Sequence, residues 1–363
     1  MKKSAWLPAV LAPVVVAGAV AAPMMANAAN TPIAGNHPTA AQVIASVAKS
    51  SDAQYSGKLE QTSALGLPQL PSGSGGSSAE GSAADTLSLL TSSHTARLYV
   101  DGPDKQRVQL TQQLAEQDVV RNGTTVWTWD SKKRAATHVT LPKDTAGSGT
   151  DAAGTATPAQ LADRAIAAIT PSTQVSTPSE VQVAGHDAWQ ITLTPKSSDT
   201  LVGSVRIAVD QQTGLPLRAT ITAKGQQDPA FSVGFSSLDY GAPAARLFDF
   251  TPPSGAKVTT KDLSDAAARD HAHGARHGDA VRPGQGVDPT VHGTGWDTIA
   301  ELPAGTVDSS KLGKDGSGLL DQLTTAVAGG RAVQTSLVSV YLTDDGRVLA
   351  GAVPVSALVA AAK

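Results

Sequence analysis

The middle of the chain alternates apolar and polar residues in short segments that are separated by turn residues. This alternation covers residues 188–193, 205–209, 217–222 and 231–235. A two-residue period is that of a β-strand with one buried face. Because the connections are too short to hold crossover helices, the pattern predicts an antiparallel sheet with a strongly apolar face.

Strand-like alternation also occurs earlier in the chain. It covers residues 55–62, 95–100, 107–111 and 134–141. Before the last of these, Asn122-Gly123 lies between two apolar runs, and this pair favours a tight hairpin. The sheet is therefore expected to include a large part of the chain.

Two segments next to the predicted strands have helical periodicity. Thr39 is a suitable N-cap for a helix that includes Ile44 and Val47, and a second helical pattern includes Leu161 and Ile166. Two helices cannot cover the whole apolar face of a long sheet. That face is therefore expected to be either a packed core or the lining of a groove.

The N-terminal segment has the features of an export signal. Two lysines precede an apolar stretch that ends at Ala26-Asn27-Ala28, a pattern that signal peptidases cleave. We expect residues 1–28 to be removed by cleavage near Ala28, and the mature protein to lie outside the cytoplasm, in the cell envelope or secreted. The alternative is an uncleaved membrane anchor, which the prolines within the apolar stretch disfavour.

Composition divides the rest of the chain into two structured parts. Residues 38–260 are expected to form the first domain, with low-complexity insertions at 65–85 and 145–157. Residues 261–290 are polar and aperiodic, and are predicted to be a linker. Residues 291–363 are predicted to form a small α+β C-terminal module.

The C-terminal module is predicted to contain a helix, a hairpin and a second helix. The first helix is expected over residues 319–327 and ends at Gly329-Gly330. The hairpin is expected over 337–342 and 348–353, and the closing helix over 356–362. About seventy residues without cysteine or metal make a marginal core on their own. We therefore expect the module to dock on the first domain.

Composition and charge exclude several classes of function. The 363 residues include 28 Lys and Arg against 31 Asp and Glu, so the net charge is −3, and aromatic residues are 4%. A nucleic-acid-binding protein needs cationic surfaces and stacking rings, so this class of protein is excluded. The absence of cysteine excludes disulfides, thiol catalysis and zinc sites built from cysteine.

Motifs for catalysis are also missing from the sequence. It contains no Gly-x-Ser-x-Gly, no phosphate-binding loop and no His-Glu-x-x-His. His271, His273 and His277 could converge on a metal ion if their segment were helical. Gly274 and Gly278 favour a solvated linker instead. We expect a protein that is not an enzyme and that binds no cofactor or metal.

Apolar residues on the predicted strands and helices form the candidate binding surface. They would line a hollow if the apolar face of the sheet is open. The set is Ile44, Val47, Trp127, Trp129, Leu161, Ile166, Trp189, Ile191, Leu193, Val205, Ile207, Ile221, Phe231 and Phe235. Alternation shows which residues share a face but not which face lies inside. For Trp127 and Trp129, burial in a core is the alternative.

Four motifs, in a fixed order, carry a resemblance to a known family. They are Gly102-Pro103-x-Lys105-x-Arg107, Asn122-Gly123-x-x-Val126-Trp127-x-Trp129-Asp130, Gly185-x-x-Ala188-Trp189-x-Ile191-x-Leu193 and Phe248-Asp249-Phe250-Thr251-Pro252-Pro253. No single motif is diagnostic. The ordered set, over roughly residues 38–258, resembles the LolA/RseB superfamily of exported lipid and lipoprotein carriers.

The resemblance implies a fold and a function. In that family an incomplete, strongly curved antiparallel barrel, or half-barrel, is covered by a lid of helices, and acyl chains occupy its hollow. The chain is therefore expected to be a mainly β (α+β) protein, a half-barrel with a helical lid plus the C-terminal module. Its expected function is to bind and carry acyl chains of lipids or lipoproteins without catalysis.

A regulator is the second hypothesis. A minimal carrier does not need residues 291–363, and RseB-like envelope-stress regulators join the half-barrel to a smaller domain. By this resemblance, the module would bind an anti-sigma-factor-type membrane protein. An enzyme ranks third.

Overall fold

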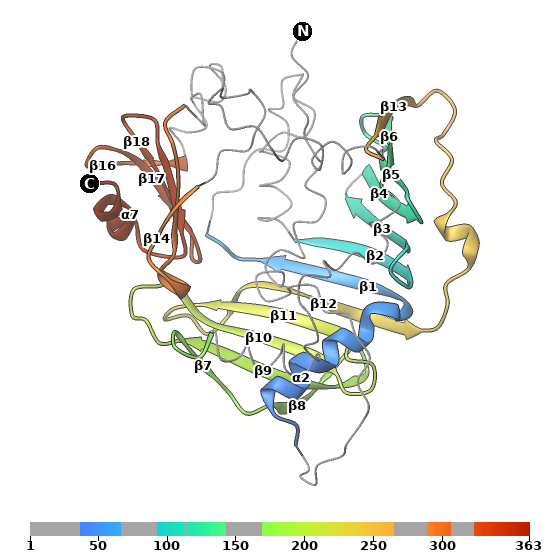
Figure 1. Ribbon diagram of the computed structural model, residues 1–363, viewed down its shortest axis with the longest axis horizontal. Coiled ribbons are helices and arrows are strands. Elements are labelled where there is room, and N and C mark those ends of the chain that lie inside the picture. The colour runs from blue at the N-terminus through green and yellow to red at the C-terminus, as the bar shows by residue number, and fades with distance from the viewer. Residues whose placement is uncertain (1–36, 67–92, 113–114, 143–168, 265–288, 306–322) are drawn as a thin grey trace, which may run out of the picture.

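The computed structural model of the protein contains two β-sheets. It describes residues 37–66, 93–112, 115–142, 169–264, 289–305 and 323–363. A 13-stranded sheet comes first in the chain, and a 6-stranded sheet belongs to the C-terminal part. Figure 1 shows the C-terminal sheet beside one end of the larger sheet.

The large sheet is built mainly from antiparallel neighbours. Its strands are β1 (Gln54–Ser63), β2 (His94–Asp101), β3 (Lys105–Gln112), β4 (Ala115–Asn122), β5 (Thr125–Asp130), β6 (Ala135–Thr140), β7 (Thr173–Val175), β8 (Ser179–Val183), β9 (His186–Pro195), β10 (Val202–Asp210), β11 (Pro216–Ala223), β12 (Pro229–Tyr240) and β13 (Lys257–Asp262). In space they follow the order β13-β6-β5-β4-β3-β2-β1-β12-β11-β10-β9-β7, and β8 also pairs with β9. The β13–β6 pair is parallel.

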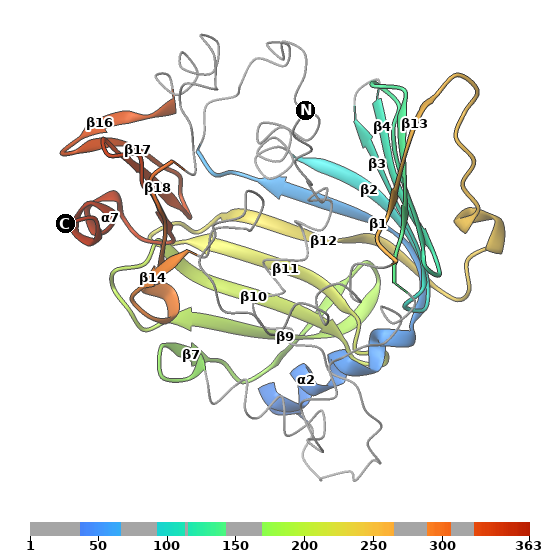
Figure 2. The ribbon, with the colours of Figure 1, turned by 45° about the horizontal axis from the view of Figure 1, so that its top comes forward.

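The large sheet is strongly curved. In Figures 1 and 2, strands β2–β6 turn away from β1 and β9–β12 around an open side. Register shifts between Lys58 and Leu59, and between Ala208 and Val209, mark irregularities of the bulge type, which bend strands and increase their twist. The predicted mainly β fold with a curved half-barrel sheet is confirmed.

Helix α2 (Ala40–Val47) is the described part of the predicted lid. It begins at a capping box, in which the Gln42 amide donates to Thr39 Oγ1 at 3.2 Å and the Thr39 amide donates to Gln42 Oε1 at 2.8 Å. A short 3-10 helix, η1 (Ala48–Asp52), follows it. The second predicted helix, with Leu161 and Ile166, lies outside the described residues.

A long connection links β12 to β13 and is here called the strap (residues 241–256). It contains the 3-10 helix η3 (Ala245–Phe248). Arg107 on β3 donates from Nη1 to the Leu247 carbonyl at 3.1 Å, and so ties the strap to the sheet. In Figures 1 and 2 the strap passes on the side of β3–β6 that faces away from the C-terminal sheet, which is the outside of the curve.

The C-terminal sheet forms a small α+β unit with its own core. Its elements are β14 (Thr290–His292), η4 (Gly295–Asp297), β15 (Ile299–Leu302), β16 (Thr325–Val327), β17 (Gly330–Gln334), β18 (Ser339–Thr343), β19 (Val348–Gly351) and α7 (Val355–Ala361). The strand order is β14-β15-β19-β18-β17-β16. Leu349 and Leu358 are fully buried, so α7 packs on this sheet. The predicted hairpin and closing helix are present, with small shifts in their ends.

One predicted element of the C-terminal module is different in the structure. The helix expected over 319–327 does not extend to Val327, which lies in strand β16 and pairs with Gly330. Gly329, at φ +78°, forms the turn of a β16–β17 hairpin rather than the end of a helix. The prediction was wrong because it read Gly329-Gly330 as the end of a helix, although two glycines favour a hairpin turn equally well. Residues 306–322 lie outside the described residues.

Other predictions also fall on residues that the structure does not describe. These include the signal peptide, residues 145–157 and the three linker histidines. Within the described part of the chain, no helix has the length and hydrophobicity needed to cross a membrane.

Candidate functional site

An apolar surface between helix α2 and the large sheet is the first part of the candidate site. On β9, Trp189, Ile191 and Leu193 share one face, and they pair directly with residues of β10. Helix α2 places Val43 on this surface, where it is only 2% exposed. The structure thus brings together seven residues predicted from the sequence. These are Ile44, Val47, Trp189, Ile191, Leu193, Val205 and Ile207.

The same apolar surface continues across the sheet toward β12. Val205 on β10 pairs with Ile221 on β11, and Ile221 pairs with Phe231 on β12. Val205 packs in both neighbouring clusters, so the two clusters form one surface. At its far end this surface contacts Leu337 and Trp296 of the C-terminal module.

Phe235 lies in a separate cluster beside the β1–β12 pair, which joins strands β2–β6 to strands β9–β11. It packs with Leu217 and Leu238, and its ring meets the Tyr55 ring edge-on at 5.9 Å between centroids. Burial raises the pKa of the Tyr55 phenol to about 12. Gly57 lets the Phe235 ring approach the β1 backbone, because a Cβ atom at this position would lie 2.8 Å from the ring.

Trp127 and Trp129 lie away from this surface, on β5. Trp127 stacks on His138 at 4.5 Å and contacts Phe250 of the strap at 5.6 Å between ring centroids. Trp127 also pairs with Val120, which pairs with Arg107, so it shares the face that carries the strap. The strap therefore covers Trp127 on the outside of the curve.

A groove opens beside the first turn of α2. It has a volume of about 740 Å³ and lies between the start of the helix and the segment around β7. Its walls are His37, Pro38, Thr39, Ala40, Ala41, Thr170, Thr173, Gln174, Val175, Ser176, Thr177, Pro178 and Lys196. Lys196 is the one formally charged side chain among these residues, and His37 meets the Trp189 ring edge-on at 5.5 Å. The groove therefore adjoins the apolar surface under α2.

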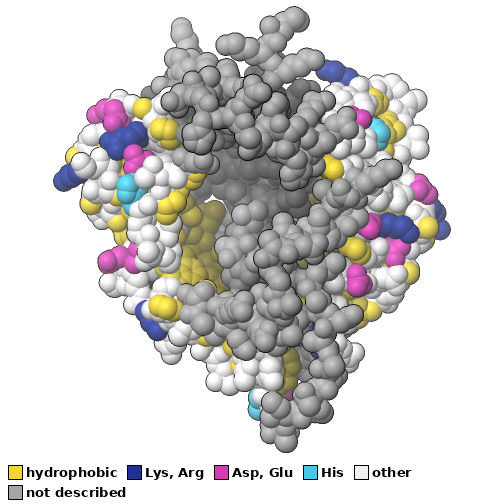
Figure 3. All heavy atoms as spheres, viewed as in Figure 1, with side chains coloured by type: hydrophobic (Ala, Val, Ile, Leu, Met, Phe, Trp, Pro, Cys, Tyr) yellow, Lys and Arg dark blue, Asp and Glu magenta, His cyan; other side chains and the backbone are white. Residues whose placement is uncertain are grey.

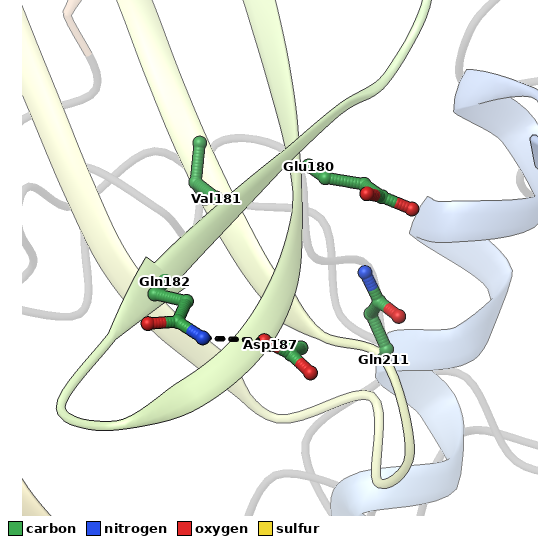
Figure 4. Close-up of a pocket in the computed structure, with 5 residues that line it drawn as sticks. All are labelled: Glu180, Val181, Gln182, Asp187 and Gln211. Atoms are coloured by element: carbon green, nitrogen blue, oxygen red, sulfur yellow. Dashed lines mark hydrogen bonds between the residues drawn. The ribbon is translucent and has the colours of Figure 1, made fainter.

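A second, smaller pocket is polar. It has a volume of about 420 Å³ and is formed by the β8–β9 hairpin and Gln211 (Figure 4). Gln182 Nε2 donates to Asp187 Oδ1 at 2.9 Å, and Glu180 adds a second carboxylate. Val181 is its single apolar wall residue, so this pocket suits a polar ligand and offers little to an acyl chain.

The space-filling view shows how the apolar surface is presented. In Figure 3 the face is hollowed near its centre, and hydrophobic side chains gather in the part of the hollow next to the C-terminal sheet. Ile191 and Phe231 are 3% and 7% exposed, whereas Trp189, Val205 and Ile207 are half-buried. The buried residues form a floor, and the half-buried ones remain within reach of a ligand.

The chemistry of this surface is that of binding. Its aliphatic and indole side chains offer no acid, base or nucleophile to a reacting group. Among the described residues, no three His, Asp or Glu side chains gather as metal ligands. The arrangement can exclude water from an apolar ligand.

Sequence reasoning missed several residues of this surface. Val209 and Val233 continue the same alternation as Ile207 and Phe231, so the signal for them was present. Trp296 and Leu337 come from the other sheet, and no local pattern links them to this surface.

Comparisons with known proteins agree with the motifs. The family model of the outer membrane lipoprotein carrier protein LolA matches residues 91–251. No curated protein sequence matches the chain.

Solved structures with low sequence identity resemble the chain. The Pseudomonas aeruginosa MucA/MucB complex contains a chain that is 18% identical, with 88% of this chain and 95% of that chain covered and a TM-score of 0.41. A conserved protein from Thermus thermophilus is 11% identical, with 61% and 98% covered and a TM-score of 0.34. A LolA superfamily protein from Nitrosomonas europaea is 12% identical, with 59% and 98% covered and a TM-score of 0.23. Together with the motif order, the match over residues 91–251 confirms the resemblance to the LolA/RseB-like superfamily that the sequence predicts.

Proposed function

We propose that this protein binds acyl chains of lipids or lipoproteins outside the cytoplasm and acts as a carrier rather than an enzyme. The observation that carries the proposal is the continuous apolar surface from α2 to Phe231, on the open side of a curved sheet. The match to the LolA family model supports the same role.

The size of the hydrophobic effect is sufficient for such binding. Each buried methylene contributes about 0.8 kcal/mol, so ten of them contribute on the order of 8 kcal/mol. Micromolar affinity corresponds to about 8.2 kcal/mol, and part of the gain is lost to ordering the ligand, so acyl chains that bury more than ten methylenes are needed to reach it. No fixed polar partner is required, which suits a carrier that must also release its ligand.

The position of the surface also suits reversible binding. Trp189, Val205 and Ile207 are half-buried beneath or beside a single short helix. A helix of eight residues has little stability of its own and is held by its packing on the sheet. A ligand that displaces part of this packing replaces the contacts between α2 and the sheet with equally apolar contacts of its own, so little free energy separates the two states.

The first experiment is native mass spectrometry with lipid extraction of the purified protein, followed by titration with a fluorescent fatty acid. The test variant is Ile207→Gln, which places an amide on the apolar surface. Arg206→Gln, at the next position of β10 on the other face, is the matched control. We expect roughly 5- to 150-fold weaker binding for Ile207→Gln, because a bound ligand would bury the amide without a partner at a cost of about 1–3 kcal/mol, and unchanged binding for the control. If the wild-type protein carries no lipid and binds no probe, the proposal is wrong.

A regulator that binds a membrane protein through the C-terminal module is the second candidate. Val291 and Val338, two of the large apolar side chains that are exposed, lie on this module at 59% and 43% exposure. The test compares capture of detergent-solubilised membrane proteins by the wild-type protein and by a Val291→Asp/Val338→Asp variant. A specific membrane protein that is lost with the variant, while fatty-acid binding is retained, would favour regulation.

A further inference from the structure

The C-terminal module is fastened to the apolar end of the large sheet. Leu337 is 6% exposed and packs with Ile221 and Phe231, and Trp296 packs in the same cluster. Leu337 lies just before β18 of the C-terminal sheet, so a residue of the C-terminal module completes the packing of the large sheet. The core of the module itself is a separate cluster around Leu349 and Leu358.

Hydrogen bonds fix this contact at several points. Trp296 Nε1 donates to Thr173 Oγ1 at 2.7 Å, and Thr173 is 1% exposed. The Ala352 carbonyl accepts from Thr200 Oγ1 at 2.8 Å and from the Leu201 amide at 2.7 Å. These bonds pair the buried hydroxyl groups of Thr173 and Thr200 with the module, and removing the module would take these partners away.

The backbones of the C-terminal module and of the first domain also lie close together. Gly295 has φ +62°, and a Cβ atom there would lie 2.9 Å from the Ser172 side chain. The Ser336 amide donates to the Leu65 carbonyl at 3.0 Å on the other flank of Leu337. Trp296 and Leu337 are thus held from both sides and cannot move aside easily.

We propose that Trp296 and Leu337 form the end wall of the acyl-chain site and set the length of chain that it accepts. This inference rests on the proposed function. The apolar surface runs from α2 through Val205 to Phe231 and stops at these two residues. A chain lying along this surface meets a rigid, well-packed wall, and methylenes beyond that wall remain in water.

The wall predicts a characteristic dependence of affinity on chain length. Up to the wall, each added methylene is buried and raises affinity roughly fourfold. Beyond the wall, added methylenes leave the affinity unchanged. The length at which the increase stops reports the position of the wall.

The test is binding of a homologous series of saturated fatty acids to the full chain. Leu337→Ala removes three carbons at the wall and should move the end of the increase to acids longer by about two to three methylenes. Leu337→Val removes one carbon and should produce a smaller shift in the same direction. Val338→Ala, at the neighbouring position with a 43% exposed side chain, is the matched control and should leave the series unchanged. Circular dichroism and size-exclusion chromatography identify any variant that is not folded, in which case Leu337→Val decides.

The outcomes separate the two proposals. If the wild-type protein binds the acids and both Leu337 variants give the wild-type length dependence, the end wall is wrong while the proposed function stands. An equal shift in Val338→Ala would also contradict the wall, because that side chain lies outside it. If no acid of any length binds to the wild-type protein, the proposed function fails, and the wall fails with it.

Discussion

The β9–β12 half and the β2–β6 half of the large sheet both carry large apolar and aromatic side chains, but these side chains are covered in different ways. In the β9–β12 half, the apolar face is covered by the short helix α2 and by a contact with the C-terminal module, and part of it remains half-buried. In the β2–β6 half, the face that bears Trp127 is covered by the strap. Large aromatic side chains therefore mark a candidate binding surface only where no segment of the same chain has already covered them.

The two halves also differ in the partners of their buried carboxylates. Asp118 on β4 is 3% exposed and forms a 2.6 Å ion pair with Arg107, which in turn holds the strap. In the β9–β12 half, Asp210 on β10 is also 3% exposed, but its carboxylate accepts hydrogen bonds from the Gln212 and Thr213 amides and the Thr213 hydroxyl of the following turn. A buried ion pair fixes one arrangement, whereas apolar contacts can be exchanged for a ligand.

Replacing Arg107 should give the largest effect. In Arg107→Ala, Asp118 is left as an unpaired buried charge, which costs about 3–5 kcal/mol in the free energy of unfolding. The measurement is urea denaturation followed by circular dichroism. Lys105→Ala, which removes an ion pair from Lys105 to Asp101 in which the lysine side chain is 44% exposed, is the control and should cost about 0–1 kcal/mol. Equal losses in both variants would show that the buried Arg107–Asp118 pair stabilises the fold no more than the exposed Lys105–Asp101 pair.

Replacing Gly214 should displace helix α2 from the β9–β12 half. At φ +74°, a Cβ atom on Gly214 would lie 2.0 Å from the Ser46 carbonyl oxygen in α2, so Gly214→Ala must push the helix away. Backbone strain alone costs about 1–2 kcal/mol, and the displaced helix adds to it. Gly225→Ala has a similar φ of +76° with nothing within 4 Å, so it isolates the backbone strain. We expect weaker fatty-acid binding for Gly214→Ala only; the same binding for both variants would contradict a role for α2 in the site.

A pair of tryptophan variants compares the two halves directly. Trp189→Leu removes apolar contact area from the half-buried surface, and we expect about tenfold weaker binding of a fluorescent fatty acid, which corresponds to about 1.4 kcal/mol. Trp127→Leu removes a ring that stacks on His138 under the strap, so binding should not change. The measurement is the same titration under conditions where both variants are folded. Weaker binding for Trp127→Leu alone would reverse the assignment of the two halves.

The smallest effect is expected from pH in the C-terminal module. The pKa of Glu301 is lowered, first by its hydrogen bond with His292 at 2.6 Å and then by Arg347 at 3.1 Å. Because the folded pKa is below the unfolded value of about 4.3, this stabilisation is present above that pH and is lost as pH falls through the folded pKa.

Glu301→Gln tests the pH effect. The wild-type protein should be more stable than Glu301→Gln near neutral pH, and the difference should shrink below about pH 4. The measurement is the urea midpoint of each protein as a function of pH. A difference that stays constant across this range would show that the ionised carboxylate of Glu301 does not stabilise the module.

Much of the fold could be predicted from local sequence because its signals are local. The alternation in residues 188–193 and 205–209 predicted β9 and β10, and Asn122-Gly123 predicted the β4–β5 turn. Thr39 predicted the start of α2. In each case the signal arises from neighbours in the chain, whose side-chain period or turn geometry is determined by the backbone itself.

The candidate site could be predicted only in part. The residues of β9 and β10 meet because adjacent antiparallel strands pair in register, and sequence alternation already places them on one face. The same alternation placed Trp127 and Trp129 together but could not indicate that Phe250, far along the chain, covers Trp127. Coverage depends on contacts between distant segments, which leave no period in the sequence.

The sequence by itself therefore determined the strands β9–β12, the β4–β5 turn, the first helix and the apolar face of the sheet, because these follow from the backbone and from nearest neighbours. The tertiary structure alone decided three matters. It placed β13 parallel to β6, covered Trp127 with the strap, and inserted Leu337 and Trp296 at the end of the apolar surface. The last two depend on burying apolar area between segments remote in sequence, whereas β13 is exposed along its whole length and is placed by backbone pairing with β6.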